Sequence, residues 1–183
     1  KYLERTERGV LSRLSKNAEF SWLVRRAYGV AGRGRLSLRG KPDSNKEVRW
    51  ILAGLEASPL VMEPEVSILR EVSTCGWIER GGALHWADPC LQDVDAHGSW
   101  QRTRPCPTEA LDDWERADLR TSAQAAAEAL VEAGYWGPFS VDAFEYEDEN
   151  GAEAWNALGE INARFTMGWA TAFGERGREL ILG

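Results

Sequence analysis

The sequence predicts an α+β protein made of short, largely antiparallel strands and a small number of helices. Two segments, 44–57 and 108–133, carry the apolar spacing or the alanine-rich composition of helices. Short runs rich in aromatic and β-branched residues fill much of the remaining chain, and glycine-containing turns of the hairpin type separate them. Hairpin turns join neighbouring strands that run in opposite directions, so these runs favour antiparallel sheets.

Composition and charge set limits on the class of protein. A chain of 183 residues is long enough to form one large domain or two small lobes around a buried core. Its net charge of -7 argues against a general nucleic-acid-binding protein, which would carry a basic face. We find no apolar run near the roughly 20 residues that span a bilayer, and no apolar core of a signal peptide. We therefore expect a cytoplasmic protein that binds neither nucleic acid nor membrane.

The cysteine pattern predicts reduced thiols. Cys75, Cys90 and Cys106 are odd in number and widely spaced, so they suggest neither a disulfide framework nor a paired-cysteine zinc site. A looser metal cluster remains as a minor alternative, although its residues lack the compact spacing of structural zinc ligands. Its candidate members are Cys90, Asp93, Asp95, His97 and Cys106.

The first 40 residues read as a helix followed by a hairpin. Segment 2–17 has apolar residues at roughly helical spacing, and we expect a surface helix there. Segment 21–28 is rich in Trp, Leu and Val and leads directly into a glycine-rich stretch. The alternating run 35–39 then predicts the returning strand of a glycine-rich hairpin.

The middle of the chain alternates between helices and strands. Ser44 and Glu47 form a capping box ahead of an apolar stripe, which predicts the helix at 44–57. A strand at 60–68 is interrupted by Glu63-Pro64, which favours an edge or connecting position. The next strands are expected at 68–74, 77–80, 83–89 and 97–103. The helical segment 108–133 is expected to break near Thr121, which offers a second capping box with Gln124.

A hairpin near the C-terminus places oxygen-bearing side chains at informative positions. Strand-like runs at 138–146 and 155–162 flank Asn150-Gly151, and they carry Asp142 on one side and Glu160 and Asn162 on the other. Glu160 and Asn162 are two residues apart and therefore share a face. A two-residue turn would set Asp142 opposite Gly159, whereas an odd loop, 150–152 or 149–153, or an equivalent bulge, sets it opposite Glu160.

We predict the odd loop or the bulge, because it brings the two carboxylates and the amide to one cation. The alternative is an acidic hairpin whose polar face is simply solvated, since acidic residues are common on exposed strands.

Two motifs resemble those of the ATP-grasp superfamily, of the carboxylate–amine ligase type. The first is WLVRRAYGVAGRGR (22–35), a basic strand and a glycine-rich loop, and the second combines GYWGPFSVDAF (134–144) with LGEINAR (158–164). The resemblance covers about residues 21–168. It implies an ATP-grasp-like fold in which two α+β lobes with largely antiparallel sheets clasp a nucleotide cleft.

The resemblance also implies a division of the chain. Residues 1–20 would be an N-terminal helix left from a longer chain, 21–62 the first lobe, and 63–183 the second lobe with the metal-binding hairpin. Members of the family usually carry a further N-terminal α/β domain, which helps to shape the substrate site.

By the same resemblance, Asp142, Glu160 and Asn162 would bind magnesium, which prefers oxygen ligands and phosphate oxygens. Arg164 would face the γ-phosphate or the acyl phosphate, a task that suits a planar, permanently charged guanidinium group. The alternative for Arg164 is a salt bridge to a nearby carboxylate.

Further residues would contact ATP. The family has a lysine on the first strand where this chain has Arg25, which keeps the charge but presents a fork in place of a point charge. Strand alternation sends Arg25 and Arg26 to opposite faces, so we assign the phosphate role to Arg25. The remaining ATP-contacting candidates are Gly29, Gly32, Arg33, Gly34 and Arg35 in the loop, Glu63 at the hinge beside adenine, and Glu71.

The resemblance implies a ligase that uses ATP and Mg²⁺ to activate a small-molecule carboxylate as an acyl phosphate, which an amine then attacks. The first alternative is a catalytically impaired ATP-binding module with a sensing or partner-binding role, for which Arg25 would mark the change. The second alternative is a structural α+β domain without nucleotide.

Overall fold

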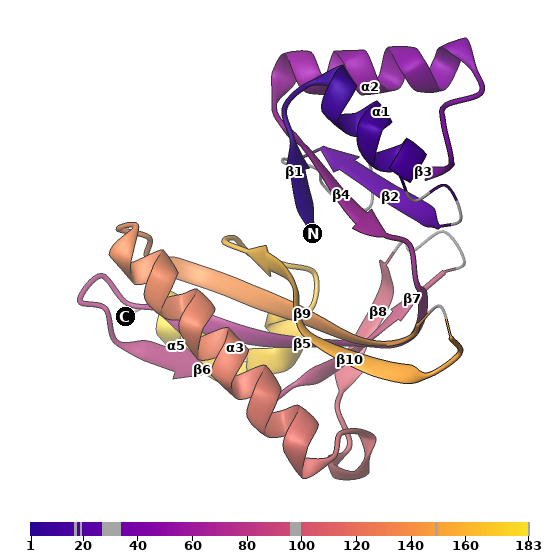
Figure 1. Cartoon of the computed structure of the whole chain (residues 1–183). Helices are drawn as coiled ribbons and strands as arrows, with labels where there is room; N and C mark the ends of the chain where they lie inside the picture. Colours follow the sequence, from indigo (N-terminus) through magenta and orange to yellow (C-terminus); the bar gives the residue numbers. More distant parts are fainter. Residues whose placement is uncertain (17, 19, 27–33, 96–99, 149, 183) are drawn as a thin grey trace. The chain divides into compact units, whose positions relative to one another are not determined.

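The computed structural model describes residues 1–16, 18, 20–26, 34–95, 100–148 and 150–182. The chain forms two compact units, Lys1–Val66 and Ser67–Gly183, and each is an α+β unit with an antiparallel sheet (Figure 1). Unit 1 therefore extends to Val66, whereas the division expected from the sequence lies at residue 62. None of the helices in the described part of the chain has the length and apolar character needed to cross a membrane.

Unit 1 contains a four-stranded antiparallel sheet in the order β1-β4-β2-β3. Its elements are β1 (Tyr2–Glu4), α1 (Glu7–Lys16), β2 (Ser21–Arg26), β3 (Arg35–Arg39), α2 (Asn45–Ala57) and β4 (Leu60–Pro64). Both helices lie on the same side of this sheet (Figure 1). The apolar side chains of α1 and α2 pack there against alternate residues of the strands, and the core consists of Val10, Leu14, Trp22, Val24, Leu38, Ile51, Leu60 and Met62.

In unit 1 the sequence predicts helix α2 correctly, but it does not predict the strand at the N-terminus. Ser44 caps α2 and forms the predicted capping box with Glu47, which confirms that helix. The helix expected at 2–17 is shorter, because residues 2–4 form β1 instead. Tyr2 and Leu3 pair with Met62 and Val61 of β4, so a distant strand overrides the local helical spacing there.

Unit 2 contains a six-stranded antiparallel sheet in the order β10-β9-β5-β7-β8, with β6 paired to β5. The strands are β5 (Ser67–Ile78), β6 (Leu84–Trp86), β7 (Cys90–Val94), β8 (Trp100–Pro105), β9 (Gly137–Glu147) and β10 (Glu153–Asn162). The separate strands expected at 68–74 and 77–80 are the single strand β5. Gly76 lets β5 continue past Phe139, because a Cβ at residue 76 would lie 2.3 Å from the Phe139 ring.

The helices of unit 2 are η1 (Thr108–Ala110), α3 (Asp113–Glu132), α4 (Trp169–Phe173) and α5 (Glu175–Leu182). The predicted break near Thr121 is wrong, since α3 runs through it. The Thr121 hydroxyl donates to the Ala117 carbonyl one turn earlier, 2.9 Å away, and therefore does not cap a new helix. The capping box of α3 is Asp112 with Glu115.

The sheet of unit 2 has two differently covered faces. Helix α3 packs against one face, where it contacts Val72, Ile78, Val141 and Ala143, and Figure 1 shows it crossing the strands. Trp169 and Phe173 of α4 pack against Cys75 on the opposite face. Because strand residues alternate between faces, Ser73 and Asp142 belong to the face opposite α3.

Candidate functional site

Asp142 and Glu160 are directly opposite each other on β9 and β10. Asn162 lies two residues beyond Glu160 and pairs with Ser140, so Glu160 and Asn162 share the face of Asp142. The side chain of Glu160 is exposed, Asp142 is half-buried, and Asn162 is buried. The prediction of an odd loop or an equivalent bulge is confirmed through the bulge. The connecting loop is also odd, but it is 148–152 and not 150–152 or 149–153, so the loop alone does not set Asp142 opposite Glu160.

The first feature is the turn between β9 and β10. Glu147 pairs with Glu153, so the segment 148–152, which has an odd number of residues, connects the strands. The Asp148 carboxylate accepts hydrogen bonds from the backbone amides of Asn150 and Ala152, at 2.8 and 2.9 Å. Gly151 has φ +78°, a left-handed conformation that favours glycine.

The second feature is a bulge in β10 between Asn156 and Glu160. Asn156 pairs with Phe144 and Glu160 pairs with Asp142, so segment 157–159 lies opposite Ala143 alone. The Asn156 side-chain oxygen accepts a hydrogen bond from the Leu158 amide at 3.0 Å, which satisfies a backbone donor that the bulge takes out of the ladder.

A chain of hydrogen bonds links the polar side chains of this face. Asn162 Nδ2 donates to Asp142 Oδ2 at 2.9 Å, and Arg164 Nη2 donates to Asn162 Oδ1 at 2.9 Å. On the other side, Ser73 Oγ donates to Asp142 Oδ1 at 2.7 Å. Arg164 is exposed and also donates to the Phe165 carbonyl at 3.2 Å. Ser73, Asp142, Asn162 and Arg164 therefore form one connected network of hydrogen bonds.

The electrostatics of this network disfavour an ionised Asp142 in the absence of a cation. Burial raises the pKa of Asp142 to about 6, and the negative charge of Glu160 adds to the rise. The hydrogen bonds from Ser73 and Asn162 and the charge of Arg164 lower the pKa and only partly offset the rise. A divalent cation between the carboxylates would relieve their repulsion and favour the ionised form.

The donor set fits magnesium better than zinc or another soft metal. Two carboxylates and one amide provide oxygen ligands, and Mg²⁺ commonly completes its shell with water and phosphate oxygens. Within the described ranges, no group of three or more His, Cys, Asp or Glu side chains is placed to hold a metal. The looser cysteine and aspartate cluster gains no support from Asp93, whose carboxylate hydrogen-bonds Arg102 and Arg104. His97 lies outside the described residues.

Unit 1 brings three predicted nucleotide-binding residues together. Arg25 of β2 is directly opposite Arg35 of β3, and Arg25 Nη2 lies 2.8 Å from Glu63 Oε1 of β4. Arg26 is on the other face, with its guanidinium carbon 5.2 Å from the centre of the Trp50 ring of α2. Arg25 is therefore on the sheet face that α1 and α2 leave open within this unit.

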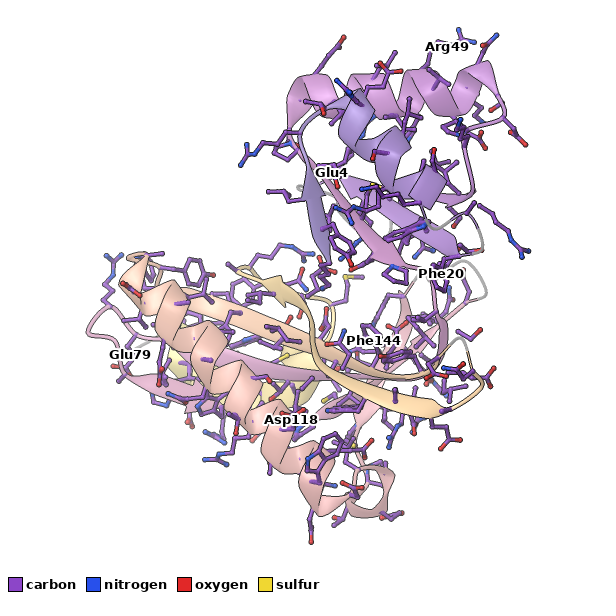
Figure 2. All side chains as sticks on the ribbon, viewed as in Figure 1. Glu4, Phe20, Arg49, Glu79, Asp118 and Phe144 are labelled. Atoms are coloured by element: carbon purple, nitrogen blue, oxygen red, sulfur yellow. The ribbon has the colours of Figure 1, made fainter. Side chains whose placement is uncertain are left out.

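The other predicted residues have different outcomes. Gly34 is described and has φ +82°, which a glycine adopts readily. Gly29, Gly32 and Arg33 lie outside the described residues. Glu71 is half-buried on β5, where it pairs with Gln92 of β7 and with Phe144 of β9. Figure 2 labels Phe144 among the side chains of unit 2. Glu71 shares the face of Ser73 two residues away.

Sequence reasoning missed Ser73. This serine stands in an ordinary buried strand segment, and its link to Asp142 spans 69 positions of the chain. A reader of the sequence would need the pairing register of β5 and β9 to find it, because no local motif marks it.

Comparisons with known proteins show which solved structures have a fold similar to that of this chain. No family model matches the chain, and none of the curated proteins matches it in sequence. D-alanyl-alanine synthetase A from Vibrio cholerae is similar over 98% of this chain and 55% of its own, at a TM-score of 0.63 and 16% identity. The biotin carboxylase domain of the Hydrogenobacter thermophilus 2-oxoglutarate carboxylase, in complex with MgADP, ADP and bicarbonate, is similar over 90% and 35%, at 0.61 and 16%.

N5-carboxyaminoimidazole synthetase from Staphylococcus aureus, in complex with ADP, is similar over 90% of this chain and 40% of its own, at a TM-score of 0.55 and 15% identity. This chain thus spans less than two thirds of the length of each of these proteins. At such low identity the likeness shows the fold alone. It confirms the ATP-grasp-like α+β fold, with its antiparallel sheets, that the sequence motifs predicted.

Proposed function

We propose that this chain forms an ATP- and magnesium-dependent ligase domain that activates a carboxylate as an acyl phosphate for attack by an amine. The observation that carries this proposal is the alignment of Asp142 with Glu160, next to Asn162 and Arg164, on one face of unit 2. The ATP-grasp-like fold supports it, as do the bound ADP and MgADP in two of the similar structures.

Asp142, Glu160 and Asn162 would hold Mg²⁺, which neutralises charge on the phosphates of ATP. Asn162 Oδ1 now accepts a hydrogen bond from Arg164, so the two side chains would separate when the amide oxygen turns to the metal. Arg164 would then be free to grip the transferred phosphoryl group with two parallel donors.

In unit 1, Arg25 would contact the phosphates in place of the lysine of the family. Arg35 is directly opposite Arg25, and two like charges across a strand pair are unfavourable unless an anion lies near them. Glu63 provides one such anion, and the phosphates of ATP would provide another. The loop glycines would let the backbone approach those phosphates.

The reaction needs no protein nucleophile, because positioning and charge neutralisation provide most of the catalysis in phosphoryl transfer. A carboxylate oxygen of the substrate attacks the γ-phosphorus, and the bond from this phosphorus to ADP breaks. The amine nitrogen then attacks the acyl carbon of the resulting acyl phosphate. Phosphate leaves, and the nitrogen gives a proton to solvent.

A second function has one observation in its favour. Arg25 replaces the lysine of the family and is held by Glu63 at 2.8 Å, which suits a module that binds ATP without turning it over. Isothermal titration of the purified protein with Mg-ATP, followed by a screen of carboxylates and amines for ADP and phosphate release, separates the possibilities. Binding with release supports the ligase, binding without release supports the sensing module, and absence of binding supports a structural domain.

A further inference from the structure

Ser73 is a buried hydroxyl at the centre of the sheet of unit 2. It lies on β5 directly opposite Asp142 of β9 and opposite Cys90 of β7, and its exposed fraction is 2%. Its Oγ donates to Asp142 Oδ1 over 2.7 Å, the length of a strong charge-assisted hydrogen bond. A side chain in this position is shielded from water, and its hydroxyl is hydrogen-bonded to Asp142.

The two oxygens of Asp142 are held from opposite sides. Ser73 on β5 donates to Oδ1, and Asn162 on β10 donates to Oδ2. Hydrogen bonds from two different strands restrict rotation of the carboxylate about its terminal torsion, which is otherwise broad and poorly defined for aspartate. Each oxygen keeps a further lone pair for another partner.

We infer that Ser73 is a positioning residue that orients the Asp142 carboxylate for a divalent cation, an inference that rests on the proposed function. Partners that orient a metal ligand typically change metal affinity by 10- to 100-fold when they are removed. Ser73 suits this role because a strand with neighbours on both sides carries it. Glu160, by contrast, is exposed and can adjust its longer side chain to the ion.

Ser140 provides a matched comparison within the same sheet. It lies two residues before Asp142 on β9, is fully buried, and has an Oγ with no hydrogen-bond partner among the described residues. Ser140→Ala removes the same group from the same face as Ser73→Ala but leaves the Asp142 hydrogen bonds in place. Ser73→Cys keeps nearly the same shape as serine and replaces the hydroxyl by a weak donor.

The experiment measures Mn²⁺ binding by electron paramagnetic resonance in the presence of ADP, together with ADP binding in EDTA. We expect Ser73→Ala to raise the Mn²⁺ dissociation constant about tenfold and to leave metal-free ADP binding unchanged. Ser73→Cys should show the same loss, and it decides the question if Ser73→Ala does not fold. Ser140→Ala should bind Mn²⁺ like the wild type.

Two outcomes overturn the inference in distinguishable ways. If the wild type binds Mn²⁺ and the Ser73 variants bind it equally well, Ser73 does not position the ligand, although the proposed function stands. If the wild type itself does not bind Mn²⁺ with ADP, the magnesium site fails, and the role of Ser73 fails with it.

Discussion

Asp142 and Glu160 face each other across β9 and β10 although the turn between these strands does not by itself align them. The pairing of Glu147 with Glu153, continued without interruption, would place Leu158 opposite Asp142. The bulge between Asn156 and Glu160 shifts the register and brings Glu160 to that position. Glu160 and Asn162 therefore depend on the bulge for their place beside Asp142.

The bulge makes Gly159 sensitive to substitution. A Cβ at residue 159 would lie 2.8 Å from Phe144 Cε1 and 3.0 Å from the backbone oxygen of Asp142. We expect Gly159→Ala to destabilise the protein by about 1–3 kcal/mol through overpacking and to weaken Mn²⁺ binding. Urea unfolding and metal titration would check this. Leu158→Ala, at the exposed neighbouring position, is the control and should change neither quantity strongly, and equal effects of the two variants would contradict the role of the bulge.

The charge of Glu160 is predicted to be essential for turnover. Glu160→Gln keeps the size of the side chain but removes the charge that a divalent cation needs, so we expect loss of ADP and phosphate release with the fold preserved. Glu160 is exposed, and circular dichroism should therefore be unchanged. Glu153→Gln, an exposed change on the same strand, serves as the control. Undiminished turnover in Glu160→Gln would refute the metal role of this carboxylate.

Sequence reasoning succeeded where the deciding interactions are local or fixed by the period of a strand. Ser44 and Glu47 are three residues apart, so the capping box of α2 is visible in the sequence. Parity predicts that Asp142 and Glu160 share a face, because an odd loop joins their strands, whereas their direct opposition also requires the bulge. The predicted helix break at Thr121 is wrong because the Thr121 hydroxyl can either cap a new helix or donate to the Ala117 carbonyl within a continuous helix. The sequence does not distinguish these two arrangements.

Non-local contacts explain what the sequence did not predict. The strand at Tyr2–Glu4 exists because β4, far along the chain, offers a free edge to pair with. The ion pair of Arg25 with Glu63 joins β2 to β4, whereas the sequence predicts separate contacts of these two residues with the nucleotide. Such pairings depend on strand order, which a single sequence indicates only weakly.

Arg25 should contribute to nucleotide affinity through its charge and its place on the open sheet face. We expect Arg25→Met to raise the dissociation constant of Mg-ADP about tenfold, because a hydrogen bond to a charged group contributes roughly 1.5–3 kcal/mol. Arg39→Met removes the same charge from the same sheet, at the far end of β3 opposite Ser21, and is the control. Isothermal titration would measure both variants, and equal weakening would mean that only the overall charge matters.

The raised pKa of Asp142 predicts how the stability of the metal-free protein depends on pH. The pKa is about 6 in the folded protein and has an ordinary value of 3.8. Between these values the unfolded chain gives up its proton first, so the folded state loses stability as pH rises through this window. The cost is complete above pH 6 and is at most about 3 kcal/mol, since each unit of pKa corresponds to about 1.4 kcal/mol.

Asp142→Asn removes this ionisation and isolates its effect from the other carboxylates. In urea unfolding with EDTA, we expect the variant and the wild type to be equally stable below about pH 4, where Asp142 is neutral in both states. The variant should become progressively more stable than the wild type between pH 4 and 6, and the difference should then stay constant to pH 7. Added Mg²⁺ should reduce the difference by stabilising the wild type alone, because binding to the folded state raises stability. A difference independent of pH would show that Asp142 is solvated like an ordinary carboxylate, and repulsion from Glu160 would then give no reason for a cation to bind there.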